Sequence, residues 1–262
     1  MSDTHGRFIW YELITSDMAA AKRFYGDVVG WTAQDMPMPD GGGEPYSILS
    51  ADGNGVGGMM NLGDAMKAQG MPPNWTGYVA VDDCDAAADK VKSLGGSVMR
   101  PPTDIPGIGR FAVIADPTGA AIAIMTPAPM DTPRPTLARN AMGNVAWHEL
   151  YAGDLEKAFA FYAELFGWKK DSDMDMGPMG AYRLFSNQEG QMGGMMTKPD
   201  NIPTPAWLYY FQVSEIRGAK ARVEADGGEV MNGPMEVPGG GWIIQGQDPQ
   251  GAVFALVGTK AA

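Results

Sequence analysis

The chain has 262 residues, 45% of them hydrophobic, and a formal net charge of −12 at pH 7. This charge argues against a nucleic-acid-binding protein, because phosphate contacts need clustered Lys and Arg, and it favours neutral or cationic ligands. No apolar run approaches the roughly 20 residues that a membrane span needs. A single cysteine, Cys84, excludes an internal disulfide framework. Residues 1–10 show no apolar signal region, so we expect a cytoplasmic protein.

The first 60 residues predict one helix and four strands. Residues 7–14 form an apolar strand, and Asp17 then supplies the N-cap of a helix. Apolar residues recur along this helix at helical spacing until Gly30 ends it, so one stripe packs against a sheet. Three short strands follow, separated by turns rich in Pro and Gly, at 31–36, 45–50 and 55–60. The pattern predicts a β-α-β-β-β module.

The same order of elements returns between residues 76 and 125. Residues 76–81 form a strand, and the apolar residues of the next helix are Ala87, Val91 and Leu94. The remaining strands are expected near 97–100, 110–115 and 120–125. Residues 116–119, Asp-Pro-Thr-Gly, suit a type I turn between the last two. This stretch predicts a second module.

The residue patterns of both modules recur in the second half of the chain. Residues 143–168 match 6–31 without gaps at 10 of 26 positions, and the second module recurs at a constant offset. The chain is therefore an internal duplication. We predict an α+β fold with four βαβββ modules in two tandem domains. The first domain spans 6–126, a Pro-rich, extended linker 127–141, and the second domain 142–258.

Short signatures shared by the halves resemble those of a known superfamily. They are Asp17, Phe24-Tyr25 and Gly30-Trp31, repeated as Asp154, Phe161-Tyr162 and Gly167-Trp168, with DPxG turns at 116–119 and 248–251. This pattern resembles the vicinal-oxygen-chelate superfamily of glyoxalase I, bleomycin-resistance proteins and extradiol dioxygenases, in particular its tandem glyoxalase-like members. The resemblance covers 6–126 and 143–258. It implies a sheet that curls around a cup in which a small molecule binds.

The positions that carry metal ligands in the metal enzymes of that superfamily lack good ligands here. They are Trp10, Thr76 and Ala123 in the first half and Trp147, Leu208 and Ala255 in the second. The chain has two histidines, His5 and His148, and strand alternation points His148 to the face opposite Trp147. Sites of this kind depend on imidazole and carboxylate donors. We therefore expect no bound transition metal and no cofactor.

A Trp-x-Glu pattern on the first strand of each half supplies the candidate catalytic residues, Glu12 and Glu149. A carboxylate among apolar neighbours must be hydrogen-bonded or have its pKa raised, which suits a general acid or base. Alternatively, each glutamate ties its strand to a backbone group or a tyrosine hydroxyl. Tyr151 shares the face of Glu149 and can donate a hydrogen bond, whereas Ile14 takes that place in the first half. Glu149 is therefore the better candidate.

Aromatic and methionine side chains and one arginine make up the candidate ligand-binding set. These are Trp10, Trp147, Tyr46, Tyr182, Tyr78, Tyr210, Met60, Met196, Arg110 and Trp242. Aromatic and methionine walls with a few polar groups describe a small-molecule pocket, although they also describe a core. The pairs Gly57-Gly58 and Gly193-Gly194 indicate bulges or close backbone approach.

The sequence favours a metal-independent glyoxalase/bleomycin-resistance-like protein. It would bind a small hydrophobic or aromatic molecule, and either sequester it or act on it through Glu12 or Glu149. One alternative is a metal-dependent glyoxalase-type lyase or dioxygenase with atypical ligands such as Glu12, Glu149 and His148. Another is a non-catalytic scaffold with vestigial pockets. The expected partner is a small molecule rather than nucleic acid or membrane, for a chain that is a monomer or a homodimer.

Overall fold

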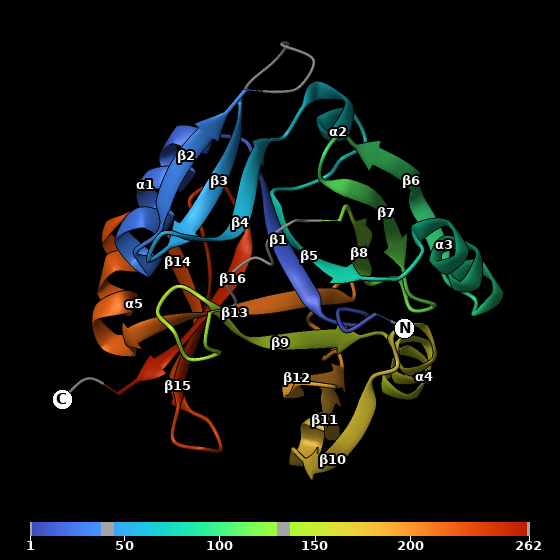
Figure 1. The fold of residues 1–262 in the computed structure, drawn as a ribbon. Coiled ribbons are helices and arrows are strands. Elements are labelled where there is room, and N and C mark those ends of the chain that lie inside the picture. The colour runs from blue at the N-terminus through green and yellow to red at the C-terminus, as the bar shows by residue number, and fades with distance from the viewer. Residues whose placement is uncertain (1, 38–44, 130–136, 261–262) are drawn as a thin grey trace. The chain divides into compact units, whose positions relative to one another are not determined.

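The computed structural model describes residues 2–37, 45–129 and 137–260 of the chain. Figure 1 shows its elements in chain order. Residues 130–136 of the predicted linker lie outside the described ranges, and the first linker residue, Pro127, is the last residue of a strand. Within the described ranges, no helix has the length and apolar composition that crossing a membrane requires.

The first module has one helix and four strands, as the sequence predicts. They are β1 (Phe8–Thr15), α1 (Met18–Val29), β2 (Thr32–Met36), β3 (Tyr46–Ala51) and β4 (Asn54–Asn61). Strands β2, β3 and β4 pair antiparallel in that order, and β4 pairs with β1 in parallel. A parallel pair needs a long connection, which α1 and the two intervening strands provide.

The ends of α1 lie where the local sequence signals place them. The Asp17 carboxylate accepts a hydrogen bond from the Ala20 N–H at 2.9 Å. At the other end Gly30 adopts a φ of 89°, the left-handed conformation that favours glycine. The apolar stripe between these two caps is buried. The third module repeats both caps, with Asp154 before α4 (Leu155–Phe166) and Gly167 after it.

The other three modules have the same order of strands and helix. The second contains β5 (Asn74–Ala80), α3 (Cys84–Ser93), β6 (Ser97–Ile105), β7 (Gly109–Ala115) and β8 (Ala121–Pro127). The third contains β9 (Val145–Ala152), α4, β10 (Lys169–Asp175), β11 (Ala181–Asn187) and β12 (Gly190–Thr197). The fourth contains β13 (Ala206–Glu215), α5 (Ile216–Ala225), β14 (Glu229–Glu236), β15 (Trp242–Gln247) and β16 (Val253–Thr259). Two short helices were not predicted, α2 (Asp64–Ala68) and the 3-10 turn η1 (Gly177–Met179).

The strands form two mixed sheets of eight strands each. Their orders are β2-β3-β4-β1-β5-β8-β7-β6 and β10-β11-β12-β9-β13-β16-β15-β14. Equivalent strands of the two halves therefore take equivalent places. This order confirms the predicted α+β fold of four βαβββ modules in two tandem domains.

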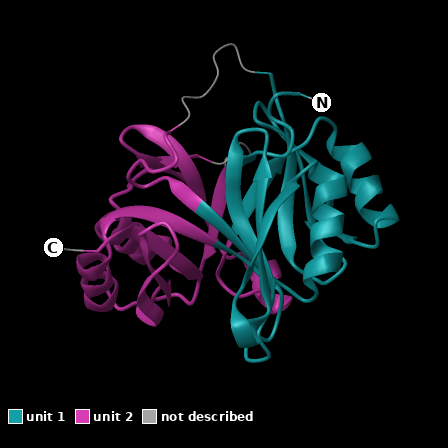
Figure 2. Ribbon diagram, turned by 90° about the horizontal axis from the view of Figure 1, so that it is seen from below, with its two compact units in different colours: residues 1–9, 76–133, 147–208 teal, residues 10–75, 134–146, 209–262 magenta. Residues whose placement is uncertain are grey.

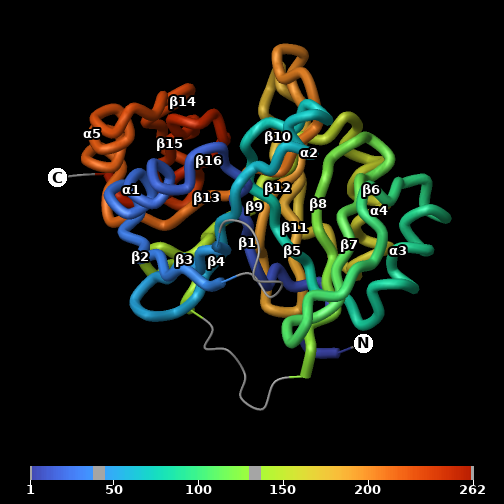
Figure 3. Tube along the Cα trace, turned by 90° about the horizontal axis from the view of Figure 1, so that it is seen from above, coloured from blue at the N-terminus to red at the C-terminus, as the bar shows by residue number. Residues whose placement is uncertain are grey.

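Compact units of the chain combine modules from different halves (Figure 2). Unit 1 (1–9, 76–133 and 147–208) holds the second and third modules, and unit 2 (10–75, 134–146 and 209–262) holds the first and fourth. In unit 1, α3 lies beside α4 (Figure 3), and Lys90 of α3 donates to the Glu164 carbonyl near the end of α4. In unit 2, Arg222 of α5 donates to the Val28 carbonyl in the same way. A cationic side chain near a helix C-terminus stabilises it.

The tryptophan of each Gly-Trp signature bonds to the segment before the first strand of the other half. In unit 1 the Trp168 indole donates to the Gly6 carbonyl at 2.7 Å. In unit 2 the Trp31 indole donates to the Gly143 carbonyl at 2.8 Å. Both indoles are buried. These bonds explain why the Gly-Trp pair is present in both halves.

Candidate functional site

The strands that carry Trp-x-Glu have one partly exposed face and one buried face. On β1, Trp10 and Glu12 are partly exposed, whereas Tyr11 and Leu13 between and beside them are buried. On β9, Trp147 and Tyr151 are partly exposed, whereas Glu149 between them is 7% exposed, as is His148 on the opposite face. Alternation along the strand produces the difference seen on β1. The partly exposed face is the one that the sequence indicated for a ligand.

In unit 1, Trp147, Tyr182 and Glu149 form a hydrogen-bonded cluster, which we call the Glu149 cluster. The Trp147 Nε1–H donates to the Tyr182 hydroxyl at 2.9 Å, and that hydroxyl donates to Glu149 Oε1 at 2.9 Å. Glu149 is 7% exposed. Met196 of β12 lies beside this cluster, since it pairs with Tyr182 in the ladder of β11 and β12.

The electrostatics of the cluster favour a neutral tyrosine beside Glu149. Burial raises the pKa of Tyr182 well above its usual range, and the negative charge of Glu149 raises it further. The Tyr182 hydroxyl therefore keeps its proton near neutral pH and remains the donor to Glu149. A hydrogen bond to a carboxylate favours the charged form of that carboxylate.

In unit 2, Trp10, Tyr46 and Glu12 form the corresponding Glu12 cluster. The Trp10 Nε1–H donates to the Tyr46 hydroxyl at 2.8 Å. Glu12 pairs with Gly58 in the parallel ladder of β1 and β4, and Ile14 pairs with Met60 two residues further along. The two halves thus bring the same residue types together from equivalent strands. Glu12 is more exposed than Glu149.

The residues behind the two clusters differ. In unit 1 the His148 ring stacks on Phe8 with centroids 3.9 Å apart, and its Nδ1 lies 2.8 Å from the Met192 carbonyl oxygen. The carbonyl can only accept, so Nδ1 carries the proton. In unit 2 the equivalent Tyr11 packs edge-on against Tyr209. His148 is therefore a packed residue on the face opposite Glu149.

The four remaining candidate residues have other contacts. Tyr78 is buried and packs against Phe111, with ring centroids 5.9 Å apart. The Tyr210 hydroxyl accepts a hydrogen bond from Gln245 at 2.7 Å. None of these contacts involves a Trp-x-Glu glutamate.

Arg110 and Trp242, equivalent residues of β7 and β15, contact charged side chains: Arg110 contacts two aspartates and Trp242 contacts a lysine. The Arg110 guanidinium donates to Asp85 at 2.6 and 3.0 Å and to Asp104 at 2.9 Å. Lys260 Nζ lies 4.4 Å from the centroid of a Trp242 ring. Arg110 is the second residue of β7 and Trp242 is the first residue of β15.

A buried arginine beside the Glu149 cluster was missed by sequence reasoning. Arg183 follows Tyr182 on β11, and its side chain is 6% exposed. It donates to Glu156 of α4 at 2.7 and 2.8 Å and to Asp173 of β10 at 2.9 and 3.1 Å. The hydrogen bonds from Arg183 and then Lys170 lower the pKa of Asp173 to about 2. These ion pairs join β11 to its neighbours and so hold the strand that carries Tyr182.

The superfamily's metal positions do not fit a metal ion in this chain. Ala123, Ala255 and Leu208 are buried and carry no donor atom, and Trp10 and Trp147 direct their indole N–H groups to tyrosines. In the part of the chain that the structure describes, no three His, Cys, Asp or Glu side chains gather as a ligand set. Because transition metals need such donors, we derive no chemical step through a metal.

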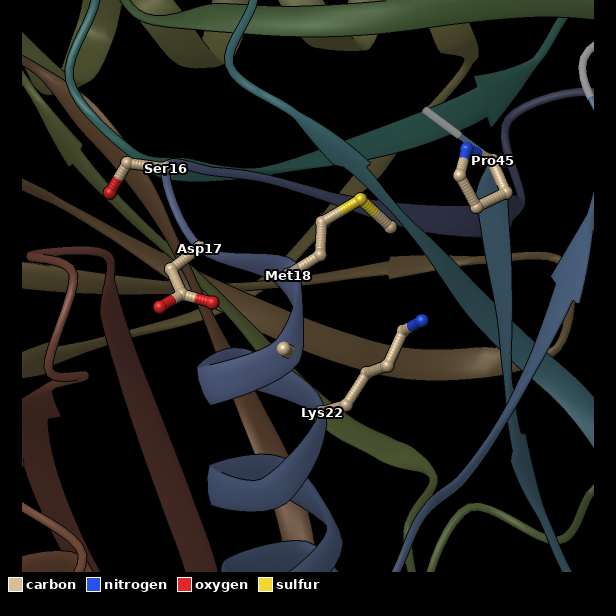
Figure 4. A pocket seen from close by; sticks show the side chains of 6 residues that line it. Ser16, Asp17, Met18, Lys22 and Pro45 are labelled. Atoms are coloured by element: carbon tan, nitrogen blue, oxygen red, sulfur yellow. The ribbon is translucent and has the colours of Figure 1, made fainter. Parts of the chain in front are cut away.

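A surface hollow of about 360 Å³ lies at the start of α1 (Figure 4). Its lining consists of Ser16, Asp17, Met18, Ala19, Lys22 and Pro45. Asp17 caps α1, and Lys22 Nζ pairs with Asp35 at 2.5 Å, so its charged groups already serve the fold. No predicted site residue lines this hollow. The candidate site is therefore placed on the Trp-x-Glu strands.

Two sheets with this module order, each carrying a Trp-Tyr-Glu set, define a tandem glyoxalase-like protein. The sequence model of the Glyoxalase/Bleomycin resistance protein/Dioxygenase superfamily matches residues 7–124 and 144–256. The chain therefore belongs to this superfamily.

Relatives of known name span nearly the whole chain. The chain is 36% identical over 248 residues to CFP32 of Mycobacterium tuberculosis, a proposed glyoxylase, covering 95% of this chain and 93% of that protein. It is 31% identical over 264 residues to the anthracycline biosynthesis protein DnrV of Streptomyces peucetius, covering 95% and 91%.

Solved structures with the same fold include a manganese-bound glyoxalase and a dioxygenase. The Mn(II)-bound glyoxalase of Novosphingobium aromaticivorans aligns with a TM-score of 0.63 at 16% identity, over 98% of this chain and 83% of that chain. The 2,2',3-trihydroxybiphenyl 1,2-dioxygenase of Sphingomonas wittichii aligns with a TM-score of 0.63 at 14% identity, over 95% and 88%. At these identities the likeness shows the fold alone.

Proposed function

We propose that this chain binds a small molecule with a planar aromatic or hydrophobic ring at the Glu149 cluster, without a metal ion. The observation that carries this proposal is the hydrogen-bonded series from Trp147 through Tyr182 to Glu149 on a partly exposed strand face. Aromatic side chains supply apolar contact area, and a few placed polar groups fix orientation, which is the usual composition of a small-molecule site.

Each residue of the cluster has a distinct role in this proposal. The Tyr182 hydroxyl is already a donor to Glu149 and an acceptor from Trp147, so it fixes the ring and the carboxylate. Glu149 is the acceptor for an O–H or N–H group of the ligand. Because Glu149 Oε1 already accepts a hydrogen bond from Tyr182, we assign the carboxylate the role of holding such a donor and not that of a base.

The net charge of the protein restricts the class of ligand that we expect it to bind. A net charge of −12 and a carboxylate in the site disfavour anionic ligands. A neutral ligand with a donor group, or a cationic one, suits the cluster best. Among the relatives, one is named for anthracycline biosynthesis and another for glyoxylase activity, so names alone do not select the ligand.

Metal independence is tested by elemental analysis. Protein purified without chelators and without a metal-affinity tag should carry no stoichiometric transition metal, because the six expected positions are Trp, Thr, Leu or Ala. About one equivalent of zinc, nickel, iron or manganese per chain, retained on dialysis, would contradict this part of the proposal. It would favour a metal-dependent lyase or dioxygenase.

Ligand binding is tested with four probes that share one ring system. These are naphthalene, 2-naphthol, 2-naphthylmethylammonium and 2-naphthoate, titrated by calorimetry. We expect 2-naphthol and the ammonium probe to bind more tightly than naphthalene, and the carboxylate probe most weakly. Glu149→Gln should lower affinity for the ammonium probe about tenfold or more, since a hydrogen bond to a charged group contributes about 1.5–3 kcal/mol. Naphthalene should stay within about twofold, because apolar contact does not depend on the carboxylate.

Glu12→Gln is the matched variant, since Glu12 holds the equivalent place in the other half. It should leave binding of all four probes unchanged if the Glu149 cluster is the site. Loss of the preference for the ammonium probe in Glu12→Gln alone would refute that assignment. No binding of any probe by the unmodified protein would contradict the proposal and favour a scaffold with vestigial pockets.

A further inference from the structure

We infer that Gly194 is a positioning residue for the Glu149 cluster, because its missing side chain lets Tyr182 lie across β12 and reach Glu149. Strand β12 stands between β11, which carries Tyr182, and β9, which carries Glu149. Figure 1 shows these three strands side by side. A side chain from β11 must therefore pass over β12 to meet a group on β9. This inference rests on the proposed role of the cluster.

The crossing point is Gly194. In the parallel ladder of β12 and β9, Gly194 pairs with Glu149. A Cβ atom built on Gly194 would lie 2.1 Å from Tyr182 Cζ and 2.3 Å from its hydroxyl oxygen. Approaches under 3.0 Å essentially never occur for real Cβ atoms. Any residue with a side chain at this position must therefore displace the Tyr182 ring from Glu149.

The other half shows the same arrangement independently. Gly58 pairs with Glu12 in the ladder of β4 and β1. A Cβ atom on Gly58 would lie 1.9 Å from the Tyr46 hydroxyl oxygen and 2.2 Å from its Cζ. Strand β4 likewise stands between β3, which carries Tyr46, and β1. A steric requirement of the Trp-Tyr-Glu set explains why glycine stands at both positions.

The preceding glycine of each pair has a different role. A Cβ atom on Gly193 would lie 2.2 Å from the His148 carbonyl oxygen, and one on Gly57 would lie 2.6 Å from the Tyr11 carbonyl oxygen. These carbonyl oxygens are backbone atoms, which cannot move without displacing a strand, and a Cβ atom on Gly193 would also lie 2.6 and 2.7 Å from two atoms of the buried Phe185 ring. Gly193 thus allows strand pairing, whereas Gly194 acts through a side chain that can swing away. The two glycines provide a matched comparison.

The test of the inference measures the tyrosine position directly. In Gly194→Ala, the Trp147 indole N–H should lose its acceptor, so its nuclear magnetic resonance signal should shift and exchange faster with solvent. Trp147→Phe assigns that signal. The preference for 2-naphthylmethylammonium over naphthalene should fall about tenfold, as in Glu149→Gln, since Glu149 loses its fixed position. Tyr182→Phe, which keeps the ring and removes the hydroxyl, should lower the preference to the same extent.

Two control variants separate positioning from a general loss of packing. Gly63→Ala places a methyl group where nothing lies within 4 Å, and it should change neither the indole signal nor the preference. Gly193→Ala should lower the melting temperature much more than Gly194→Ala, because it meets backbone. If Gly194→Ala fails to fold, adding Tyr182→Ala removes the ring that the new methyl group meets. That double variant should recover the folded state, and failure to recover it would overturn the inference.

Failure of the inference can be distinguished from failure of the proposed function. An unchanged Trp147 indole signal in a folded Gly194→Ala variant overturns the positioning role, whatever the probes do. If Glu149→Gln and Tyr182→Phe leave the probe preference unchanged, the proposed function fails. The indole signal then still decides whether Gly194 holds Tyr182.

Discussion

The effect of the Tyr25 hydroxyl in unit 2 on the free energy of unfolding can be worked out from its two buried hydrogen bonds. It is 0% exposed, it donates to Asp248 Oδ2 at 3.0 Å, and it accepts from the Trp75 indole at 2.8 Å. Tyr25→Phe removes one oxygen atom and leaves both buried partners without it. A lost bond to a charged acceptor costs about 1.5–3 kcal/mol, and an unsatisfied buried N–H about 1–3 kcal/mol. We expect the free energy of unfolding to fall by about 3–5 kcal/mol near neutral pH.

Tyr162 of unit 1 provides the matched control for this substitution. Its hydroxyl accepts from the Trp207 indole at 3.1 Å, as Tyr25 does from Trp75. The equivalent carboxylate atom, Asp116 Oδ2, is buried and has no hydrogen-bond partner in the described part of the chain. Tyr162→Phe therefore cannot remove a donor from it. Its cost should be smaller than that of Tyr25→Phe by about 2 kcal/mol.

The pH dependence of the difference follows from Asp248. Burial raises the pKa of Asp248 above its ordinary value of 3.8, while hydrogen bonds from Ala252 and Tyr25 oppose this rise. The folded state therefore holds the Asp248 proton more tightly than the unfolded state, and stability falls as pH rises through the folded pKa. Without the Tyr25 hydroxyl the charged form loses support, so the cost of Tyr25→Phe is largest above that pKa. It should approach the cost of Tyr162→Phe as Asp248 becomes protonated.

Urea unfolding of both variants at about pH 7 and about pH 4, near the ordinary carboxyl range, measures this difference. Equal costs of the two variants at neutral pH would refute the reasoning about Asp248. A difference that stays constant between the two pH values would refute the assignment of the pH dependence to its ionisation.

Three further predictions concern single side chains. Trp168→Phe removes the indole bond to the Gly6 carbonyl and should lower the free energy of unfolding by about 2–4 kcal/mol. Trp31→Phe, with its bond to Gly143, should cost the same within about 1 kcal/mol in urea unfolding. Asp173, with a pKa of about 2, adds stability above the ordinary carboxyl pKa that is lost as pH falls toward about 2. Asp173→Asn should remove that part of the acid unfolding curve, and an unchanged curve would contradict it. Burial raises the pKa of the Cys84 thiol to about 11, so Cys84 should not react with an aromatic disulfide reagent at about pH 8 until urea unfolds the chain. Fast reaction of the folded protein would show the thiol to be accessible.

The fold could be predicted because its signals are local and repeated. Caps such as Asp17 and Gly30 act within a few residues, and periodic apolar residues define the buried stripe of α1. Because the chain is duplicated, the same caps and apolar stripes occur in both halves, and each half supports the prediction made for the other. The short helix α2 and the turn η1 have no apolar stripe, and α2 has no counterpart among the described residues of the other half, so these signals did not predict them.

The candidate site could be predicted only in part. The Trp-x-Glu face and the tyrosines Tyr46 and Tyr182 were identified from the sequence, because alternation along one strand is a local property. The contact between Tyr182 and Glu149 crosses a third strand, β12. It depends on the register between strands, which the residue pattern of a single strand does not contain. The glycine pairs did indicate close backbone approach, but not that a tyrosine ring is what approaches. The partners of Arg110 come from α3 and β6 and likewise depend on the tertiary fold.

The duplicated halves do not correspond to the compact units, and this difference decides which residues a substitution affects. Each eight-stranded sheet belongs to one half, but each unit pairs a module of one half with a module of the other. The Gly-Trp signature is the local form of this exchange, because Trp31 and Trp168 each bond to the segment that opens the other half. A change in one half therefore alters a unit that contains residues of both. The exchange also supplies the residues behind the two clusters, because Tyr11 of the first half packs against Tyr209 of the second, and His148 of the second half stacks on Phe8 of the first.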